Sequence, residues 1–492
     1  MKKPMRALLF AALVAAFPGA AVQAGAPDML RDAARKAVVA NPEVQARWHA
    51  FLASEAEQDA ARGGYRPRVD LTAGIGRERQ YFEGQGTERY THRNATLSLN
   101  QMVYDGFYTR NDVARLGHAR LVRYYELMDA SEGAALEALR AYGDVSRYRE
   151  LVRLAQENYV QHKQVYDQIG ERTQSGVGRR VDLEQATGRL ALAESNLLTE
   201  VSNLHDVSAR YLRLIGEVPP EQLASMEGVL PPVDLPPSVN DALREAFAGS
   251  PMLYAAVENV DAGQRLVDMR RAANRPRVDL RARQALDHNL DGYDGNSREQ
   301  VVELVLSYNL YRGGADQARI REAAETLNVA RDQREKACRD LRQTLSIAYN
   351  DSQRLVEQLR YLDQHQLSIE KARQAYRNQF DIGQRTLLDL LDTENEYFQA
   401  RRAYVNASYD LLTAKARTLA AIGRLMPALD VARENMPTAV ELGQERTGID
   451  PASICPPDAP MPLQIDKAAL LEAALREAGA APASRSAASS RA

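Results

Sequence analysis

The hexapeptide RPRVDL occurs at Arg66–Leu71 and again, 209 residues later, at Arg275–Leu280. Upstream of each copy, Asn-Pro at 41–42 corresponds to Ser-Pro at 250–251, also 209 residues apart. Downstream the offset is 207 for three further pairs: MVYDG with NLYRG, GVGRRVDLEQA with GQRTLLDLLDT, and YLRLIGE with TLAAIGR. This period is far longer than the roughly 20–50 residues of a solenoid repeat. The sequence therefore predicts one large unit that is used twice.

The N-terminus has the pattern of a secretory signal peptide. Basic residues precede an apolar stretch, Ala7–Phe17, and a small-residue cleavage site ends at Ala24. We therefore expect residues 1–24 to be removed and the mature chain to be exported, without a lipid anchor because no cysteine lies near that site. After residue 26, no stretch approaches the roughly 18 consecutive apolar residues that a membrane-spanning helix needs. Any contact with a membrane should then be made through strands.

The composition favours neither a cofactor site nor an enzyme. The two cysteines, Cys338 in a charged helical run and Cys455 in a Pro-rich tail, are not a disulfide framework, and we expect unpaired thiols. The seven histidines show no metal-ligand spacing, and the formal net charge of −3 comes with interspersed basic residues rather than a nucleic-acid patch. No nucleophile elbow or phosphate-binding loop occurs. We expect no cofactor, no metal, no nucleic acid and no catalysis.

Proline placement predicts very long helices. No proline occurs between Pro67 and Pro219, or between Pro276 and Pro427. Because an internal proline costs a helix about 3 kcal/mol or more, these two long stretches can hold uninterrupted helices. The prolines instead collect in a connector at 217–237.

Each Pro-free stretch opens with a predicted β-hairpin. RVDLTAGIG and ATLSLNQMVY alternate apolar and polar residues with period two, around the turn FEGQGTER. RVDLRARQAL and VVELVLSYNLY repeat the pattern around DHNLDGYDGNS, which predicts hairpins over 68–104 and 277–311. On the last strand one face should carry Val302, Leu304, Leu306, Tyr308 and Leu310.

Aromatic residues gather at both ends of these strands, as in the girdles of outer-membrane barrels. The alternative is a pair of ordinary half-buried hairpins with surface tyrosines. The residues are Tyr81, Phe82 and Tyr90 on the turn side, and Tyr104, Phe107, Tyr108, Tyr308 and Tyr311 on the helix side.

After each hairpin the apolar period becomes helical, with narrow coiled-coil stripes rich in alanine. Residues 118–175 would form a helix of about 87 Å. Gly-bearing turns at 174–178 and 381–385 then predict a return helix in each unit. The expected organisation is a first repeat at 25–216 with its helical hairpin at 105–216, the connector at 217–237, a second repeat at 238–427 with its helical hairpin at 312–427, and a largely irregular or disordered tail at 428–492 that holds one short helix near 468–478.

Four strands per chain cannot close a barrel, because about eight are needed for a filled lumen and more for a water channel. Strand edges in lipid must be paired, so several copies of the chain are required. The fold class that we expect is mostly α with a β-barrel part.

The order of these elements, the NPEV motif at 41–44 and GQRTLLDLLDTENEYFQARRAY at 383–404 together resemble the TolC family of outer-membrane channel-tunnels. The resemblance covers roughly residues 28–427, and its most specific part is G-x-R-T-x-x-D-x-L-D from Gly383 to Asp392. It implies a homotrimer with a twelve-stranded outer-membrane barrel and a long periplasmic α-helical tunnel. It also implies two partners, a periplasmic adaptor protein and an inner-membrane ABC or other export pump.

The resemblance also implies roles for residues near the helical turns. Asp389 and Asp392 would point into the closed periplasmic aperture, where a ring of carboxylates repels anions and binds cations. The alternative is a solvated acidic helix start, favoured by the helix dipole. Asp182, which lies 207 residues before Asp389, and Arg385 would form charged links that hold the tips shut, although Phe380 replaces a tyrosine that some members use there. The tip turns, where the adaptor would dock, contain Gly176, Val177, Gly178, Ile382 and Gly383.

The cargo is less directly encoded, because protein secretion, small-molecule efflux and metal efflux share this architecture. Few histidines disfavour metal export, and the absence of a lipidation cysteine disfavours the lipoprotein branch that commonly serves multidrug pumps. We therefore favour type I protein secretion, with multidrug or small-molecule efflux as the alternative. A non-pore periplasmic coiled-coil structural protein is the alternative of another class.

Overall fold

The computed structural model describes residues 26–84, 86–223, 235–434, 436–444, 454–460 and 463–480. The expected signal peptide, part of the Pro-rich connector and the last dozen residues lie outside the described residues.

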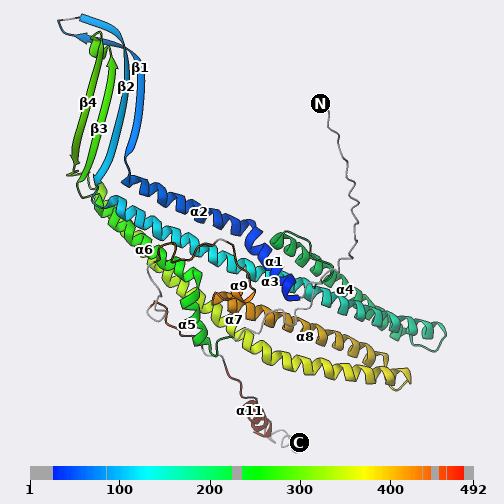
Figure 1. Ribbon diagram of the computed structural model, residues 1–492. Helices are drawn as coiled ribbons and strands as arrows, with labels where there is room; N and C mark the ends of the chain where they lie inside the picture. The colour runs from blue at the N-terminus through cyan, green and yellow to red at the C-terminus, as the bar shows by residue number, and fades with distance from the viewer. Residues whose placement is uncertain are drawn as a thin grey trace, which may run out of the picture.

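Six elements occur in the same order twice, in agreement with two tandem units (Figure 1). The first unit contains α1 (Ala26–Ala40), α2 (Pro42–Arg62), β1 (Arg68–Phe82), β2 (Gly86–Tyr104), α3 (Tyr108–Gln174) and α4 (Arg180–Ile215). The second contains α5 (Val239–Gly249), α6 (Pro251–Ala272), β3 (Arg277–His288), β4 (Asn296–Ser307), α7 (Ala315–Asp381) and α8 (Leu387–Ala421), followed by α9 (Leu425–Ala428) and α11 (Lys467–Ala480).

The long helices exceed the predicted length. Both α3 and α7 have 67 residues, which corresponds to about 100 Å. Segments of three and seven residues separate these helices from the strands, and at their ends Phe107 (φ 72°) and Gly314 (φ 82°) take left-handed conformations that turn the chain into the helix. The return helix α8 ends earlier than predicted, at Ala421, because Gly423 (φ 72°) packs so closely on Gly249 that a Cβ would lie 2.9 Å from its carbonyl oxygen.

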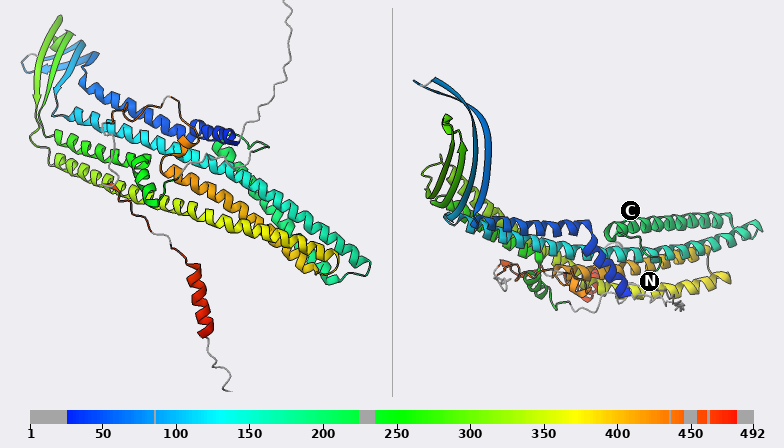
Figure 2. Two further views of the ribbon diagram at one scale, coloured as in Figure 1. Left: turned by 60° about the horizontal axis from the view of Figure 1, so that its bottom comes forward. Right: turned by 45° about the horizontal axis from the view of Figure 1, so that its top comes forward.

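The helices form one long layer that runs away from the sheet (Figure 2). Near the sheet, α2, α3, α6 and α7 lie side by side in that order, and farther away the order is α4, α3, α8 and α7. In this order α2 and α4 form one flank of the layer, and α7 forms the other.

No helix among the described residues combines the length and the apolar character needed to span a membrane.

The main core lies where the two units meet, about midway along the long helices. Its helices contact one another through small side chains, which allows the close packing that an alanine-rich stripe predicts. The tail after α9 joins this core and a neighbouring cluster through Val431, Leu442 and Cys455. Fully buried members from the helices include Ala138, Ala141, Tyr142, Ala246, Phe247, Leu345, Ala416 and Leu419.

The four strands form one antiparallel sheet in the order β1-β2-β3-β4. Opposed residues of antiparallel strands share a face, so the register defines an apolar face and a polar face. The apolar face holds Val69, Leu71, Ala73, Ile75, Ala95, Leu97, Leu99, Val278, Leu280, Ala282, Leu286, Val302, Leu304 and Leu306, interrupted by Gln284 and Gln300. The polar face holds Asp70, Thr72, Gly74, Asn94, Thr96, Ser98, Asp279, Arg281, Arg283, Asp287, Glu299 and Glu303.

Some residues at the predicted strand ends are placed differently from expectation. Tyr90 lies on the polar face, where its hydroxyl donates a hydrogen bond to Glu78 Oε2 at 2.8 Å, so it is not part of an outward girdle. The last strand ends at Ser307, four residues before the predicted end, so Tyr308 and Leu310 follow the strand as exposed side chains.

The expectation of unpaired thiols is wrong. Cys338 on α7 and Cys455 in the tail form a disulfide bond, with their Cα atoms 5.6 Å apart. The tail returns along α7, where the Arg342 guanidinium donates to the Pro456 carbonyl at 2.9 Å. In the chain-entropy account, a cross-link across a 117-residue separation stabilises the folded chain by about 4–5 kcal/mol.

A buried carboxyl joins α3 to α9. The Glu132 carboxylate accepts a hydrogen bond from the Met426 backbone N–H at 3.2 Å. Burial raises the pKa of Glu132 to about 7, and the nearby Asp129 carboxylate acts in the same direction. An acid whose pKa is higher in the folded chain than in the unfolded chain opposes folding once it is ionised.

We therefore predict that Glu132→Gln stabilises the protein in a pH-dependent way. Glutamine keeps a carbonyl acceptor for Met426 but cannot ionise. The stability difference should be absent below about pH 4.5, grow as the pH rises towards 7, and reach up to about 3 kcal/mol above that. Thermal unfolding of both proteins between pH 4.5 and 8.5 measures this difference. A gap that does not change with pH would contradict the assignment.

Candidate functional site

The two helical hairpins, α3/α4 and α7/α8, end together at the end of the molecule farthest from the sheet (Figure 1). Each turns at a glycine with positive φ, Gly176 at 78° and Gly383 at 76°. Beside these glycines, Val177 in the α3/α4 turn is 83% exposed, and Ile382 in the α7/α8 turn is 69% exposed. Gly178 is required by packing, because a Cβ there would lie 2.8 Å from the Thr173 backbone nitrogen. Each tip thus presents one apolar side chain on a rigid turn.

Asp389 caps the start of α8. Its carboxylate accepts hydrogen bonds from the Thr386 N–H at 3.2 Å and the Thr386 hydroxyl at 2.8 Å, while the Asp389 N–H donates back to that hydroxyl at 3.3 Å. These hydrogen bonds hold the pKa of Asp389 below its usual value. Asp389 therefore carries a stable negative charge at a fixed position beside the tip.

Arg385 and Asp182 do not form the charged link that was expected between the two tips. Arg385 is engaged within its own hairpin: it donates to Gln379 Oε1 at 3.0 Å, stacks on the Tyr376 ring at 4.4 Å, and lies 3.9 Å from Asp389. Asp182 is half-buried in the first turn of α4, and no ion pair joins it to the described residues. Within one chain, Arg385 and Asp182 do not connect the tips.

Other polar contacts join the hairpins, and sequence analysis did not identify them. Asp392 on α8 forms an ion pair with Arg189 on α4. Farther from the tip, Arg402 on α8 forms an ion pair at 2.7 Å with Glu200 on α4, whose side chain is 2% exposed. On the sequence these residues look like ordinary charged positions of amphipathic helices, because only the packing of one helix on the next brings them together.

Apolar packing connects the tips as well. Phe380 on α7 is buried, and the Arg172 guanidinium lies 5.5 Å from its ring centroid. Its cluster also contains residues from α3, α4 and α8, so Phe380 makes hydrophobic contact between the hairpins. The other buried members are Val165, Ile169, Ala186, Leu387, Leu390 and Leu391.

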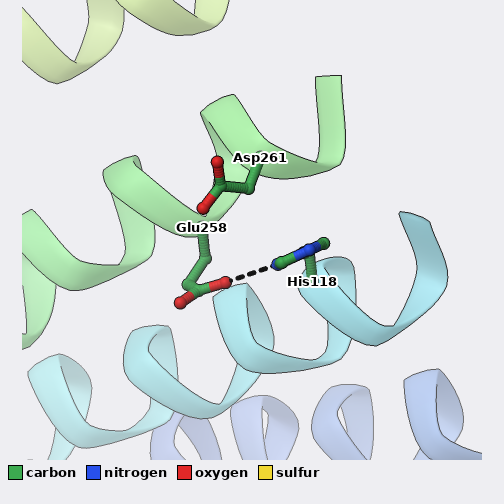
Figure 3. A group of neighbouring side chains, drawn as sticks. All are labelled: His118, Glu258 and Asp261. Atoms are coloured by element: carbon green, nitrogen blue, oxygen red, sulfur yellow. Dashed lines mark hydrogen bonds and ion pairs between the residues drawn. The ribbon is translucent and has the colours of Figure 1, made fainter. Parts of the chain in front are cut away.

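A second group of titratable residues lies near the sheet, between α3 and α6 (Figure 3). His118 Nδ1 lies 2.7 Å from Glu258 Oε2, and Asp261 is one turn away on α6. Their ligand atoms lie within 4.8 Å of one another, a spacing that sequence reading missed because the residues are about 140 positions apart. The adjoining cavity of about 540 Å³ is also lined by Arg62 and Arg120. Arg62 pairs with Asp59, and Arg120 donates to the Leu442 carbonyl, so the contact between His118 and Glu258 is what joins α3 to α6 in this group.

The chain is similar to outer-membrane efflux and secretion proteins. The family model described as outer membrane efflux protein matches residues 33–217 and 242–424, one segment in each unit. Outer membrane efflux protein BepC of Brucella suis is 25% identical over 366 residues, covering 74% of this chain and 78% of that protein. Alkaline protease secretion protein AprF of Pseudomonas aeruginosa is 26% identical over 332 residues, covering 66% and 68%.

A solved structure shares the fold. The CmeC outer membrane channel of Campylobacter jejuni superposes with a TM-score of 0.71 at 14% identity, covering 80% of this chain and 86% of that chain.

The ion pairs between the hairpins should differ in strength according to burial. Arg402→Ala leaves the buried Glu200 carboxylate without its ion-pair partner and should destabilise the contact by about 2–4 kcal/mol. Arg189→Ala breaks a more exposed pair and should cost less than about 1 kcal/mol. Hydrogen exchange over residues 186–205 and 387–405 reports the loss of protection. Equal effects of the two substitutions would refute this ranking.

Proposed function

The chain belongs to the outer membrane efflux protein family, and from that premise we propose that it forms the exit duct of a tripartite export system for type I protein secretion. Members of this family are outer-membrane proteins and not enzymes. The proposed partners are two further copies of the chain, a periplasmic adaptor protein and an inner-membrane ABC or other export pump.

The observation that carries the proposal is a two-faced sheet with two open edges. In lipid every backbone N–H and C=O must be paired, yet β1 and β4 have no outer strand partner among the described residues. Joining β4 of one copy to β1 of the next satisfies these edges. Three copies then give twelve strands, with the apolar face towards lipid and the polar face towards a lumen.

The same closure fits the helices. Because β4 leads into α7 while α2 leads into β1, joining the edges brings α7 of one copy beside α2 and α4 of the next. Both flanks expose apolar side chains that this contact would cover. They are Leu192, Leu198, Val201 and Leu212 on α4, and Val329, Ile347, Val356 and Leu367 on α7.

At the other end of the tunnel, the tips provide an aperture. We propose that Asp389 and Asp392 from three copies form a ring of six carboxylates. The Thr386 hydrogen bonds keep Asp389 ionised, whereas Arg189 compensates Asp392. Displacing Arg189 would both loosen the hairpins and expose a second charge. In this proposal Asp182 and Arg385 contact the neighbouring copy, and Val177 and Ile382 form the apolar points at which the adaptor docks beside Gly176, Gly178 and Gly383.

The proposed cargo follows from the relative named for alkaline protease secretion, AprF. The relative named for efflux, BepC, supports small-molecule efflux as the second candidate. The two differ in what a deletion strain would lose.

Deleting the gene for this chain should remove one or two large proteins from the culture supernatant, and a plasmid copy should restore them. Quantitative mass spectrometry of supernatants from the parent, deletion and complemented strains measures this. An unchanged secretome together with increased drug sensitivity would reject protein secretion and support the efflux duct.

The carboxylate ring should bind multivalent cations. In planar bilayers, a trivalent metal complex added on the tip side should block the wild-type channel, and Asp389→Asn with Asp392→Asn should weaken the block at least tenfold. Asp167→Asn, on α3 in an ion pair with Lys163, is the matched control and should behave as wild type. A soluble protein without conductance would instead indicate the non-pore structural role.

A further inference from the structure

The apolar face of the sheet ends in a group of arginines at the end away from the helices. We propose that this arginine belt binds the phosphate groups of phosphorylated glycolipid (lipid A) in the outer leaflet of the outer membrane. The inference rests on the proposed barrel, in which this face points to lipid. The belt consists of Arg77, Arg79, Arg89, Arg93 and Arg298.

The register places all five on the apolar face. Ile75 lies opposite Arg93, so Arg77 and Arg79, two and four residues further along β1, share its face. Arg89 is opposite Arg79, and Arg298 is opposite Leu286.

The strands carry no acidic residue on this face. The other positions on this face beyond the apolar rows are Tyr81, Thr87, Thr91, His288 and Asn296.

Arginines on the two faces differ in their partners. On the polar face, Arg68 pairs with Asp70 at 2.8 Å, Arg277 with Asp279 at 2.9 Å and Arg283 with Glu299 at 2.7 Å. The five belt arginines are exposed, and no hydrogen bond or ion pair joins their guanidinium groups to any described residue. A charge-complementary partner would therefore come from outside the described residues.

The position of the belt matches the level of lipid head groups. The apolar rows from Val278 to Leu286 extend about 27 Å along the strand, or about 21 Å across the membrane at a tilt near 40°. This is close to the apolar band of about 25 Å in outer-membrane barrels. Arg298 lies in the row of Leu286 at the edge of this band, and the other four arginines lie beyond it. An arginine deeper in the hydrocarbon would cost about 2–4 kcal/mol, whereas one at or just beyond the edge meets the head groups.

The chemistry of the belt suits phosphate. A guanidinium presents paired N–H donors that match two phosphate oxygens, and it remains charged at any physiological pH. Three copies would place fifteen such groups around the barrel, five from each chain, so several lipid phosphates could be held at once.

The test measures binding of lipid A to the purified full-length trimer in mild detergent. Wild type should bind diphosphorylated lipid A at least tenfold more tightly than lipid A without its phosphates, and 0.5 M NaCl should remove most of the difference. The triple variant Arg77→Gln, Arg89→Gln, Arg93→Gln should bind the diphosphorylated lipid at least tenfold more weakly. Equal binding of both lipids by wild type would overturn the proposal without any variant.

A matched control removes the same charge from the other face. Arg68→Gln, Arg281→Gln, Arg283→Gln also deletes three arginines per chain and should bind lipid A within twofold of wild type. Equal weakening by both triple variants would overturn the proposal, because it would indicate net charge rather than the belt. Trimer assembly and conductance of wild type are measured in parallel. Their failure would refute the duct itself, whereas normal conductance with unchanged lipid binding in the belt variant would refute the belt alone.

Discussion

The unpaired outer edges of β1 and β4 are the constraint on which the rest of the structure depends. A lone four-stranded sheet with one apolar face can be stable neither in water nor in lipid, since water would meet the apolar side chains and lipid would meet bare backbone groups. The proposed repetition of the chain around an axis would resolve both problems. The long helices would then be arranged around the same axis, because the strands lead directly or through short segments into them.

The pairing of charged side chains differs between the two faces of the sheet. Basic and acidic side chains pair with one another on the polar face, and between the hairpins Arg402 and Arg189 meet carboxylates. On the apolar face the charged side chains are all arginines, and they have no ion-pair partner among the residues that the structure describes. In the proposed barrel, the paired charges would face water or protein, and the five arginines would face the anionic head groups of the membrane.

Sequence reasoning captured the features that depend on local periodicity and on breakers of regular structure. The twofold repeat, the hairpins that start at Arg68 and Arg277, and the helical hairpins follow from period two, from Pro-free runs and from glycine turns. It failed where residues distant in sequence meet. The partners of Asp392 and Cys338 lie on other segments, and the facing of Tyr90 depends on a register that alternation alone does not fix.

The disulfide bond of the tail links the fold to the redox state of the compartment in which the chain resides. Disulfides form and persist in oxidising compartments and are rare in the cytoplasm, so we expect the bond between Cys338 and Cys455 to form after export. Before export, the segment around Cys455 would have no covalent tie to α7, although Cys455 belongs to the main core. The oxidation state of these two residues therefore reports whether a chain has reached an oxidising compartment.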